Sequence, residues 1–560
     1  MRKIFWALTW LSLVLYACTP ADKPLPPDGG DGPATEDPDV PEGMNLKGRV
    51  VDLSGNGMEG VVVSDGRQCV VTEADGTYWM KIDAADVKFI YISTPAGYQP
   101  VISGGRPIFY RPLSSQPLKQ GVYEIDTFKL TPVDNPGRAT VFFTADPQPR
   151  AGTVGYDNLG YHSLDCCEDL YQDLQETAAG ITGRQVFGVC LGDLVHENMS
   201  LYKNYTDGLR RVGYPTYNVI GNHDNNPAAN DDDAAAAEYE SYFGPRNYSF
   251  NVGNIHFVVL DNLMMKDKSG RLTGYDQGLT DKIWEWLQAD LSFVPKTMTV
   301  ATCSHSPMFK TQSGETSARH KDDYANLLKG YAKVFAWAGH THATHNYVYP
   351  KGHKFAGIEV HTLSRCTGEL WTNDYLSYGT PRGYTIVEIE NGEFASWRFH
   401  PVKYQRAKFI GAGTPPPYVF RDWTYDENGV AQMKDGSGVL DESYQMHVYP
   451  PVGTYGDSKV YVNVFLWDNL WEKPEFILDG GPPVVMTPVE STSRYDFADT
   501  EFKSWYKSHN STLAGDSSYK ASSTSNPNTL FSTPVSATSG SGTVRVTDRF
   551  GNVYTETVSW

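Results

Sequence analysis

The sequence is poor in basic side chains for its length. Its 560 residues contain 47 Lys and Arg against 66 Asp and Glu, a formal net charge of −19 at pH 7. A field of this sign repels polyanions, so we expect no nucleic-acid partner. The chain also lacks the composition of a disordered protein, because it carries 35 Tyr, 24 Phe and 13 Trp. Three or four folded units are therefore expected.

The N-terminal apolar run is too short to cross a bilayer. It extends from Ile4 to Ala17 behind two basic residues, whereas a transmembrane helix needs roughly 20 residues. Such a run is typical of an export signal, which predicts a signal peptide over residues 1–17. It ends in LYAC, residues 15–18, which resembles the lipobox of bacterial lipoproteins and implies lipid attachment to Cys18. An ordinary signal peptide with a nearby cysteine is the alternative.

Residues 18–43 have the composition of a tether. From Thr19 to Gly43 there are seven prolines and seven acidic residues against one lysine, without apolar periodicity. The expectation is an exported monomer that a lipid anchor holds on the cell envelope, at the outer membrane of a Gram-negative cell and facing either the periplasm or the surface. That anchor would be the only link to the membrane.

Cysteine is scarce, and its spacing does not indicate a disulfide framework. Apart from Cys18 there are six, of which Cys166 and Cys167 are neighbours and Cys190 and Cys303 lie in apolar runs. We expect most of them to be small buried hydrophobic residues.

Three folded parts follow the tether. Residues 44–133 alternate short β-rich runs with Gly and Asp turns and contain no histidine, which favours a β-sandwich. This part resembles the carboxypeptidase-regulatory-like sandwich. Residues 401–560 are again strand-like, and a second β-rich domain fits them. Its tryptophans could form a carbohydrate platform, but core packing is the preferred interpretation.

Strands and helices alternate between residues 137 and 400, which favours a layered α/β domain. The helix candidates are Ser163–Ala179 and Asp281–Leu291, the second with Thr280 as its N-cap. The strand candidates are Thr140–Ala145, Gln185–Leu191, Tyr217–Ile220, Ile255–Leu260, Met298–Cys303 and Val334–Ala338.

Five of these six strands are followed by residues that commonly bind metal ions. In chain order they are Asp146 and Gln148, then Asp193, then Asn222, His223 and Asp224, then His305, then His340 and His342. Ligands of layered α/β domains bind at the carboxyl ends of the strands, so these residues could form one site.

The ordered motifs DPQ, GD, GNHD, H and GHTH resemble those of the calcineurin-like metallophosphoesterase family. Further segments, residues 365–371 and 379–384, resemble a bacterial lipoprotein subgroup with an N-terminal prealbumin-like and a C-terminal β-domain. The resemblance implies a layered αββα core flanked by the two β-rich parts. It also implies a dinuclear metal-dependent phosphoric ester hydrolase, either a phosphatase or a phosphodiesterase.

The resemblance further implies a ligand set for two metal ions, of Mn, Zn, Fe or Ni. Asp146, Gln148, Asp193 and His342 would form the first site. Asp193, Asn222, His305 and His340 would form the second. A carboxylate can bridge two cations, while neutral imidazoles and amide oxygens complete the shells without excess charge.

In such a centre a hydroxide that bridges the two metals attacks the phosphorus of a mono- or diester. His223, next to a ligand in sequence, is expected to be the general acid that protonates the leaving oxygen, with Asp224 as its orienting partner. The substrate would be a phosphorylated small molecule or head group. His256 and His361 lie within strand runs and are interpreted as structural.

Two residues depart from the usual pattern. Gln148 stands where most members have histidine, which would weaken the first site or shift its metal preference. His196 follows Asp193 by three residues and could be an additional metal ligand, a contact to the substrate phosphate or part of the cleft wall.

The competing hypothesis is a glycan-directed surface binding lipoprotein whose phosphoesterase domain is degenerate. Gln148 and the flanking β-domains favour it. Asp193, Asn222, His223 and the GHTH motif count against it, because all are intact.

Overall fold

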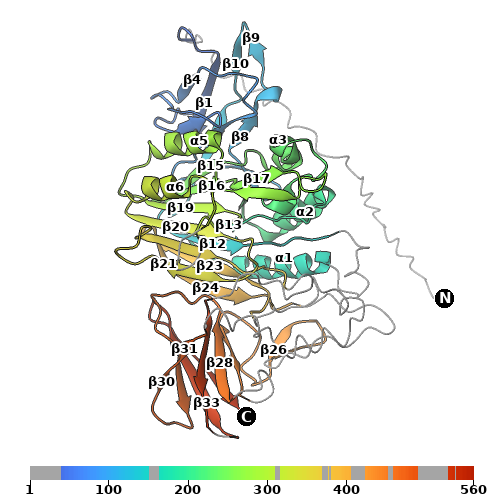
Figure 1. The fold of residues 1–560 in the computed structure, drawn as a ribbon. Coiled ribbons are helices and arrows are strands. Elements are labelled where there is room, and N and C mark those ends of the chain that lie inside the picture. Colours follow the sequence, from blue (N-terminus) through green and yellow to red (C-terminus); the bar gives the residue numbers. More distant parts are fainter. Residues whose placement is uncertain are drawn as a thin grey trace, which may run out of the picture. The chain divides into compact units, whose positions relative to one another are not determined.

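The structure is a computed structural model (Figure 1), and it describes residues 40–150, 163–309, 316–368, 376, 380–404, 423–451, 458–489, 528–536 and 538–560. The predicted signal peptide, Cys18 and most of the predicted tether lie outside these ranges. The chain divides into two units, Met1–Pro41 and Glu42–Trp560. In the described part of the chain, no helix has the length and apolar character needed to cross a membrane.

Residues 44–133 form two facing sheets, as predicted for a β-sandwich. The first has the order β7-β6-β11-β1-β10-β9, with β4 also paired to β1, and the second has the order β3-β2-β5-β8. Their strands are β1 (Leu46–Asp52), β2 (Val62–Ser64), β3 (Cys69–Val71), β4 (Thr77–Met80), β5 (Phe89–Ile92), β6 (Tyr98–Ser103), β7 (Arg106–Ile108), β8 (Tyr110–Pro112), β9 (Leu118–Lys119), β10 (Val122–Glu124) and β11 (Phe128–Pro132), with the 3-10 helix η1 (Leu113–Ser115).

The middle of the chain forms two further sheets and a hairpin. The five-stranded sheet has the order β14-β13-β12-β23-β24, and the six-stranded sheet has the order β15-β16-β19-β20-β22-β21. Their strands are β12 (Ala139–Thr144), β13 (Gln185–Cys190), β14 (Thr216–Asn218), β15 (Tyr248–Val252), β16 (Ile255–Leu260), β19 (Thr299–Ser304), β20 (Lys333–Ala338), β21 (His345–Val348), β22 (Ile358–Thr362), β23 (Gly383–Glu390) and β24 (Glu393–Pro401); the hairpin is β17 (Leu263–Lys266) with β18 (Gly274–Gln277).

Alternation along β12 determines how these sheets are layered. Phe143 points to the other sheet and stacks on Trp337 of β20 at 4.3 Å between ring centroids. Its neighbour Phe142 points the other way and packs with Leu170 and Leu174 of α1 (Ser163–Ala179). Successive strand residues face opposite sides of a sheet, so an apolar strand of this kind is covered on both faces.

Helices cover the outer faces and complete the predicted αββα core (Figure 1). Helix α1 lies on the five-stranded sheet, whereas α5 (Asp281–Leu291) buries Trp286 and Leu287 in the core cluster of the six-stranded sheet. Thr280 Oγ1 accepts the N–H of Ile283 at 3.2 Å, which confirms the predicted cap of α5. The remaining helices are α2 (Tyr202–Val212), α3 (Asp232–Ala235), α4 (Ala237–Phe243), α6 (Lys321–Leu328), η3 (Met199–Leu201) and η4 (Asn222–Asp224).

The C-terminal part is β-rich, as predicted. Its sheets have the orders β27-β28-β32-β31 and β30-β29-β33-β34, beside the hairpin β25-β26. Trp423 and Trp471 are buried, in agreement with core packing. The strands are β25 (Trp423–Tyr425), β26 (Ala431–Met433), β27 (Met446–Tyr449), β28 (Lys459–Val464), β29 (Glu475–Leu478), β30 (Val484–Val485), β31 (Thr487–Pro488), β32 (Leu530–Pro534), β33 (Ser541–Thr547) and β34 (Val553–Ser559).

The sandwich and the six-stranded sheet share a buried polar network. Ser249 Oγ lies 2.8 Å from Ser93 Oγ and 2.7 Å from Asp290 Oδ1, and His256 Nε2 lies 2.8 Å from Asp290 Oδ2. A bridge between Thr94 and the edge strand β15 continues the sheet into the sandwich. His256 is thus a structural residue, as predicted.

The cysteines also agree with the sequence analysis. All six described cysteines are free thiols, and five of them are buried. Cys366 is among the buried ones, and its backbone N–H donates to Ala145 O at 3.0 Å. Burial raises the pKa of its thiol, so it is a packing residue rather than a nucleophile.

Candidate metal centre and active site

The predicted site residues converge because the strands that carry them are parallel. β12, β13 and β14 are parallel neighbours in one sheet, and β19 and β20 are parallel neighbours in the other. All five therefore end at the same edge of the core. The side chains assembled there are Asp146, Gln148, Asp193, Asn222, His305, His340 and His342.

Five of these seven residues have left-handed backbone conformations, which non-glycine residues rarely adopt. The φ angles are 53° at Asp146, 39° at Gln148, 55° at Asp193, 67° at His340 and 57° at His342. Each costs on the order of 1–3 kcal/mol and persists only where the surroundings fix it. The concentration of such residues in one place is typical of a functional site.

The glycines of the GD, GN and GH motifs make this close assembly possible. A Cβ on Gly192 would lie 2.6 Å from His305 Nδ1, and one on Gly339 would lie 2.7 Å from Asp146 Oδ2. A Cβ on Gly221 would collide with the carboxylate of Asp193. The glycines are therefore required by the approach of one ligand loop to another.

Two fully buried carboxylates form the centre of the site. Asp193 Oδ1 accepts the backbone N–H of His223 at 2.9 Å, and Asp146 Oδ2 accepts that of His340 at 3.0 Å. Burial alone would raise the pKa of Asp193, but the imidazoles of His305 and His223 outweigh it, so the pKa lies well below its usual range. Two anions therefore share one buried pocket, which favours bound cations.

His305 is oriented by the backbone. Its Nδ1 lies 2.7 Å from Leu191 O, a carbonyl that can only accept, so Nδ1 carries the proton and Nε2 faces the site. Nε2 lies 3.2 Å from Asp193 Oδ2 and 3.2 Å from Asn222 Oδ1. Although burial opposes it, the charge of Asp193 raises the pKa of His305 to about 9. The pocket thus attracts positive charge strongly.

The two GHTH histidines suit metal binding because they are neutral. Burial and the neighbouring His305 lower the pKa of His340 to about 4. Burial and the charge of Arg365 lower the pKa of His342. Asp146, Asp193 and His342 each offer a ligand atom within 4.8 Å of the others, and His340 Nδ1 lies 3.2 Å from His305 Nε2. This donor set fits two cations that share Asp193.

Gln148 is oriented differently from the predicted oxygen ligand. Its Nε2 donates to Asp193 Oδ2, and its Oε1 accepts from Nη2 of Arg365. A guanidinium has only donors, so the amide oxygen must face it. Gln148 would have to release Arg365 before its oxygen could bind a metal. Arg365 is buried, and its Nη2 also lies 2.8 Å from His342 Nε2.

The carboxylate beside His223 is Glu197, not Asp224 as predicted. Glu197 Oε1 lies 3.5 Å from His223 Nδ1, and the backbone N–H of Glu197 donates to His223 O at 2.9 Å. Asp224 instead fastens the loops of the site together. Its carboxylate accepts from the N–H groups of Gly221, Leu194 and Val195 and from the hydroxyl of Tyr202.

His196 lies with this acid pair. Its ring stacks on that of His223 at 4.0 Å between centroids, and His196, Glu197 and His223 form a group separate from Asp146, Asp193 and His342. Burial and the charge of His223 lower the pKa of His196 to about 2. Of its three predicted roles, this position favours the cleft wall or a substrate contact over a ligand in the carboxylate pocket.

The β17-β18 hairpin supplies residues that sequence reasoning missed. Tyr275 Oη lies 2.7 Å from His340 Nε2 and so fixes the ring on the side away from His305. Arg271 Nη2 lies 3.7 Å from Glu197 Oε2. The sequence signals were the Ser269-Gly270 turn and the polar alternation around Tyr275, which indicate a hairpin but not its position.

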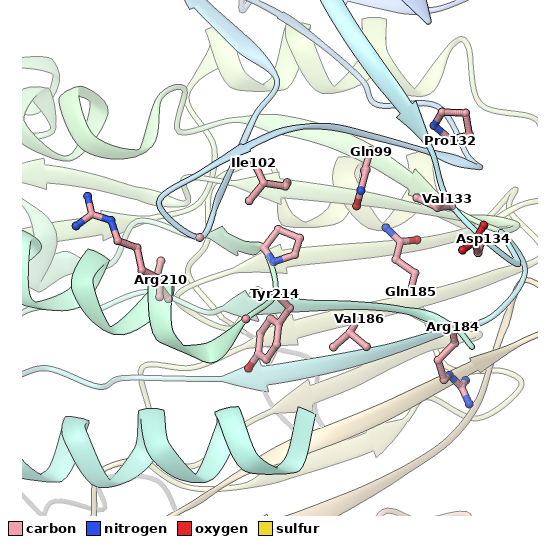
Figure 2. Close-up of a pocket in the computed structure, with 14 residues that line it drawn as sticks. Gln99, Ile102, Pro132, Val133, Asp134, Arg184, Gln185, Val186, Arg210 and Tyr214 are labelled. Atoms are coloured by element: carbon pink, nitrogen blue, oxygen red, sulfur yellow. The ribbon is translucent and has the colours of Figure 1, made fainter. Parts of the chain in front are cut away.

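A large cavity lies at the opposite edge of the core. It has a volume of about 620 Å³ and is lined by residues of the sandwich and by the amino ends of β13 and β14. Figure 2 shows Gln99, from the sandwich, and Gln185, from β13, facing each other across it. The cavity contains none of the predicted site residues.

Family models identify the class of protein to which this fold belongs. Residues 139–344 match the calcineurin-like phosphoesterase model. Residues 44–133 match the model of the N-terminal part of calcineurin-like phosphoesterases, and residues 361–554 match that of the C-terminal part. The chain belongs to the calcineurin-like phosphoesterase family.

Individual similarities are distant. Purple acid phosphatase 15 of Arabidopsis thaliana is 23% identical over 207 residues, which are 34% of this chain and 35% of that protein. The chain thus spans about a third of that relative's length. A dimetal phosphatase from Danio rerio is 15% identical, with coverage of 45% and 92% and a TM-score of 0.31. Purple acid phosphatase PPD1 of Lupinus luteus is 14% identical, with coverage of 61% and 67% and a TM-score of 0.34.

Proposed function

We propose that the protein hydrolyses phosphate mono- or diesters with two metal ions at the carboxyl ends of β12–β14, β19 and β20. The observation that carries this proposal is the pair of buried, ionised carboxylates, Asp146 and Asp193, surrounded by imidazoles and an amide. When bound, two cations there would draw charge from the phosphoryl oxygens and provide the nucleophile from water.

The protein's own residues would supply the proton for the leaving group. The main-chain N–H of His223 donates to Asp193 Oδ1, and Nδ1 of the His223 ring faces Glu197. The other ring nitrogen, Nε2, is then the atom that can donate a proton to the leaving oxygen. Glu197 would hold the ring in this orientation and stabilise its protonated form.

The glycan-binding alternative is less well supported. It requires a decayed phosphoesterase site. The strained backbone, the close loop contacts at the motif glycines and the contact between His223 and Glu197 are nevertheless all present. Decay would leave no reason to maintain several left-handed residues at one edge of the core.

The test is a panel of aryl substrates with the released phenol as the readout, because both monoesters and diesters release it. Protein loaded with Mn²⁺, Zn²⁺, Fe or Ni²⁺ is expected to hydrolyse aryl phosphates or bis-aryl phosphodiesters. Asp193→Ala should abolish this activity. The same turnover in both proteins, or none in the wild type with any of these metals, would refute the proposal.

We also propose that the protein is exported and anchored by lipid at Cys18. The apolar run and the LYAC sequence support this. Metabolic labelling with a radioactive fatty acid should mark the wild type and not Cys18→Ser, and that variant should leave the membrane fraction. Equal labelling of both would contradict the anchor.

A further inference from the structure

Two arginines from separate loops flank the acid pair at the rim of the site. Arg271 lies in the β17-β18 hairpin, and Arg150 follows the β12 loop that carries Asp146. The pKa of Glu197 lies below its usual range because His223 bonds to it, and the charges of Arg271 and Arg150 add to that effect. Both guanidinium groups are therefore within electrostatic reach of one carboxylate.

The backbone of Arg150 is fixed by helix α1. Its N–H donates to Ser163 Oγ at 2.7 Å, and the same hydroxyl group lies 2.9 Å from its carbonyl oxygen. The next loop is tied to this one, since the N–H of His196 donates to Pro149 O at 3.1 Å. Arg150 thus extends from a fixed point beside the His196–His223 stack.

The backbone of Arg271 is fixed as well. Its carbonyl oxygen accepts the N–H groups of Lys268 at 2.6 Å and Thr273 at 2.9 Å. The adjacent Leu272 is buried and donates its N–H to Pro227 O at 3.0 Å. Arg271 thus extends from backbone that is already ordered, so a ligand that binds there does not have to order the loop.

The position of these arginines relative to His223 indicates what they would contact. In the proposed function, the reacting phosphoryl group lies at the carboxylate pocket and His223 protonates the leaving oxygen. Glu197 faces His223 Nδ1, Arg271 Nη2 lies 3.7 Å from Glu197 Oε2, and the charge of Arg150 also acts on Glu197. Two guanidinium groups that act on one carboxylate place positive charge at this part of the rim, in a chain of net charge −19.

We propose that Arg150 and Arg271 bind an anionic substituent on the leaving group, so that the preferred substrates are phosphate esters that carry a second phosphate or a carboxylate. Guanidinium groups bind both kinds of oxyanion through charge-assisted, bidentate hydrogen bonds. This inference rests on the proposed function and adds the substrate class to it.

The test uses three matched three-carbon esters: glycerol 3-phosphate, 3-phosphoglycerate and glycerol 1,3-bisphosphate. The wild type is expected to show a kcat/KM about 10- to 100-fold higher for one or both of the esters that carry a second anionic group than for glycerol 3-phosphate. A preference for 3-phosphoglycerate alone would identify a carboxylate, and a preference for the bisphosphate alone would identify a phosphate.

Arg271→Ala and Arg150→Ala should each reduce this preference about tenfold or more, and Arg271→Lys should restore part of it. A disturbed Glu197 would slow all three esters alike, so the ratio isolates the arginine effect. Arg138→Ala is the matched control, because Arg138 precedes β12 at the opposite edge of the core and pairs with Glu390 at 2.8 Å. Thermal unfolding of each variant checks folding.

Three results would overturn the inference. One is equal kcat/KM for the three esters in the wild type. Another is a preference that survives in both arginine variants, and a third is a preference that Arg138→Ala removes equally. Hydrolysis of glycerol 3-phosphate in these cases would leave the proposed function intact. No phosphate from any of the three esters would also overturn the inference, and the proposed function falls with it only if aryl phosphates and bis-aryl phosphodiesters are not hydrolysed either.

Discussion

The two edges of the β12–β14 sheet differ in a way that separates space from chemistry. The amino edge has the cavity of about 620 Å³, lined by polar, charged and apolar side chains, among them Gln99 and Gln185 (Figure 2). The carboxyl edge has two buried carboxylates, imidazoles and strained backbone. Desolvated charge and backbone strain both lower the stability of the fold, so they persist only where function requires them. A gap between two domains costs little stability. The difference teaches that charge and strain identify the site better than volume does.

The largest effect should come from the bridging carboxylate. Asp193→Asn removes the charge shared by the two proposed metal sites and is expected to lower kcat/KM by about 10³-fold or more, because charge stabilisation of several kcal/mol is lost. Bound metal, measured by elemental analysis, should fall together with activity. Full metal content and full activity in this variant would remove the distinction between the two edges.

The acid pair should come next. His223→Asn is expected to lower kcat for poor leaving groups by about 10²-fold or more, and much less for good ones, because only poor leaving groups need the proton. Glu197→Gln should show the same dependence more weakly. The slope of log kcat against leaving-group pKa is the measurement, and Asp224→Asn, which disturbs the loops, should not steepen it selectively.

Tyr275 should affect metal binding more than chemistry. Tyr275→Phe removes the hydroxyl next to His340 Nε2 and is expected to weaken metal affinity about 10-fold, as the loss of such supporting contacts often does. Competition with a chelator measures this affinity. Normal affinity with reduced turnover would instead place Tyr275 in contact with the substrate.

A third region, where β24 meets the segment after β26, is expected to affect the stability of the fold and not the catalytic site. The bond from His400 to Glu442 lowers the pKa of Glu442 to about 2, although burial opposes it. A depressed carboxyl pKa stabilises the fold above the unfolded value near 4.5, and this contribution is lost as the pH falls towards 2. The urea midpoint of the wild type should fall as the pH is lowered from 4.5 towards 2, and Glu442→Gln should make this fall smaller. Glu285→Gln, which changes an exposed ion pair with Arg67, should leave the fall unchanged.

The smallest effect belongs to the cavity at the amino edge. Gln185→Ala and Gln99→Ala are expected to change kcat/KM by less than about twofold and stability by less than about 0.5 kcal/mol. Steady-state kinetics and thermal unfolding would check both values. A large loss of activity would show that the two edges are coupled.

The sequence predicted the scaffold of the site well. Strand candidates such as Ile255–Leu260 agree with the structure, and others such as Thr140–Ala145 differ by a residue, because apolar runs covered on both faces are conspicuous. The carboxyl ends of parallel strands lie at one edge of the core. The sequence could therefore predict that Asp146 and His340 lie close together, although they are far apart in the chain.

The side chains around that scaffold could not be predicted in the same way. Glu197 and Asp224 are both acidic and near His223 in space or in sequence, and only the loop path decides which one faces its ring. Arg365 and Tyr275 reach the site from a loop and a hairpin that have no fixed spacing to the motifs. Loop geometry depends on tertiary packing, which periodicity does not encode.

The buried network between Ser93, Ser249 and Asp290 limits how the protein can be divided. A fragment that begins at Arg138 retains every proposed ligand, yet it loses the sandwich residues that bond to β15 and leaves the edge of the six-stranded sheet bare. Unprotected sheet edges pair with one another and promote aggregation. Soluble production of the catalytic core therefore requires the sandwich, and the two parts are expected to be inherited together rather than exchanged as independent modules.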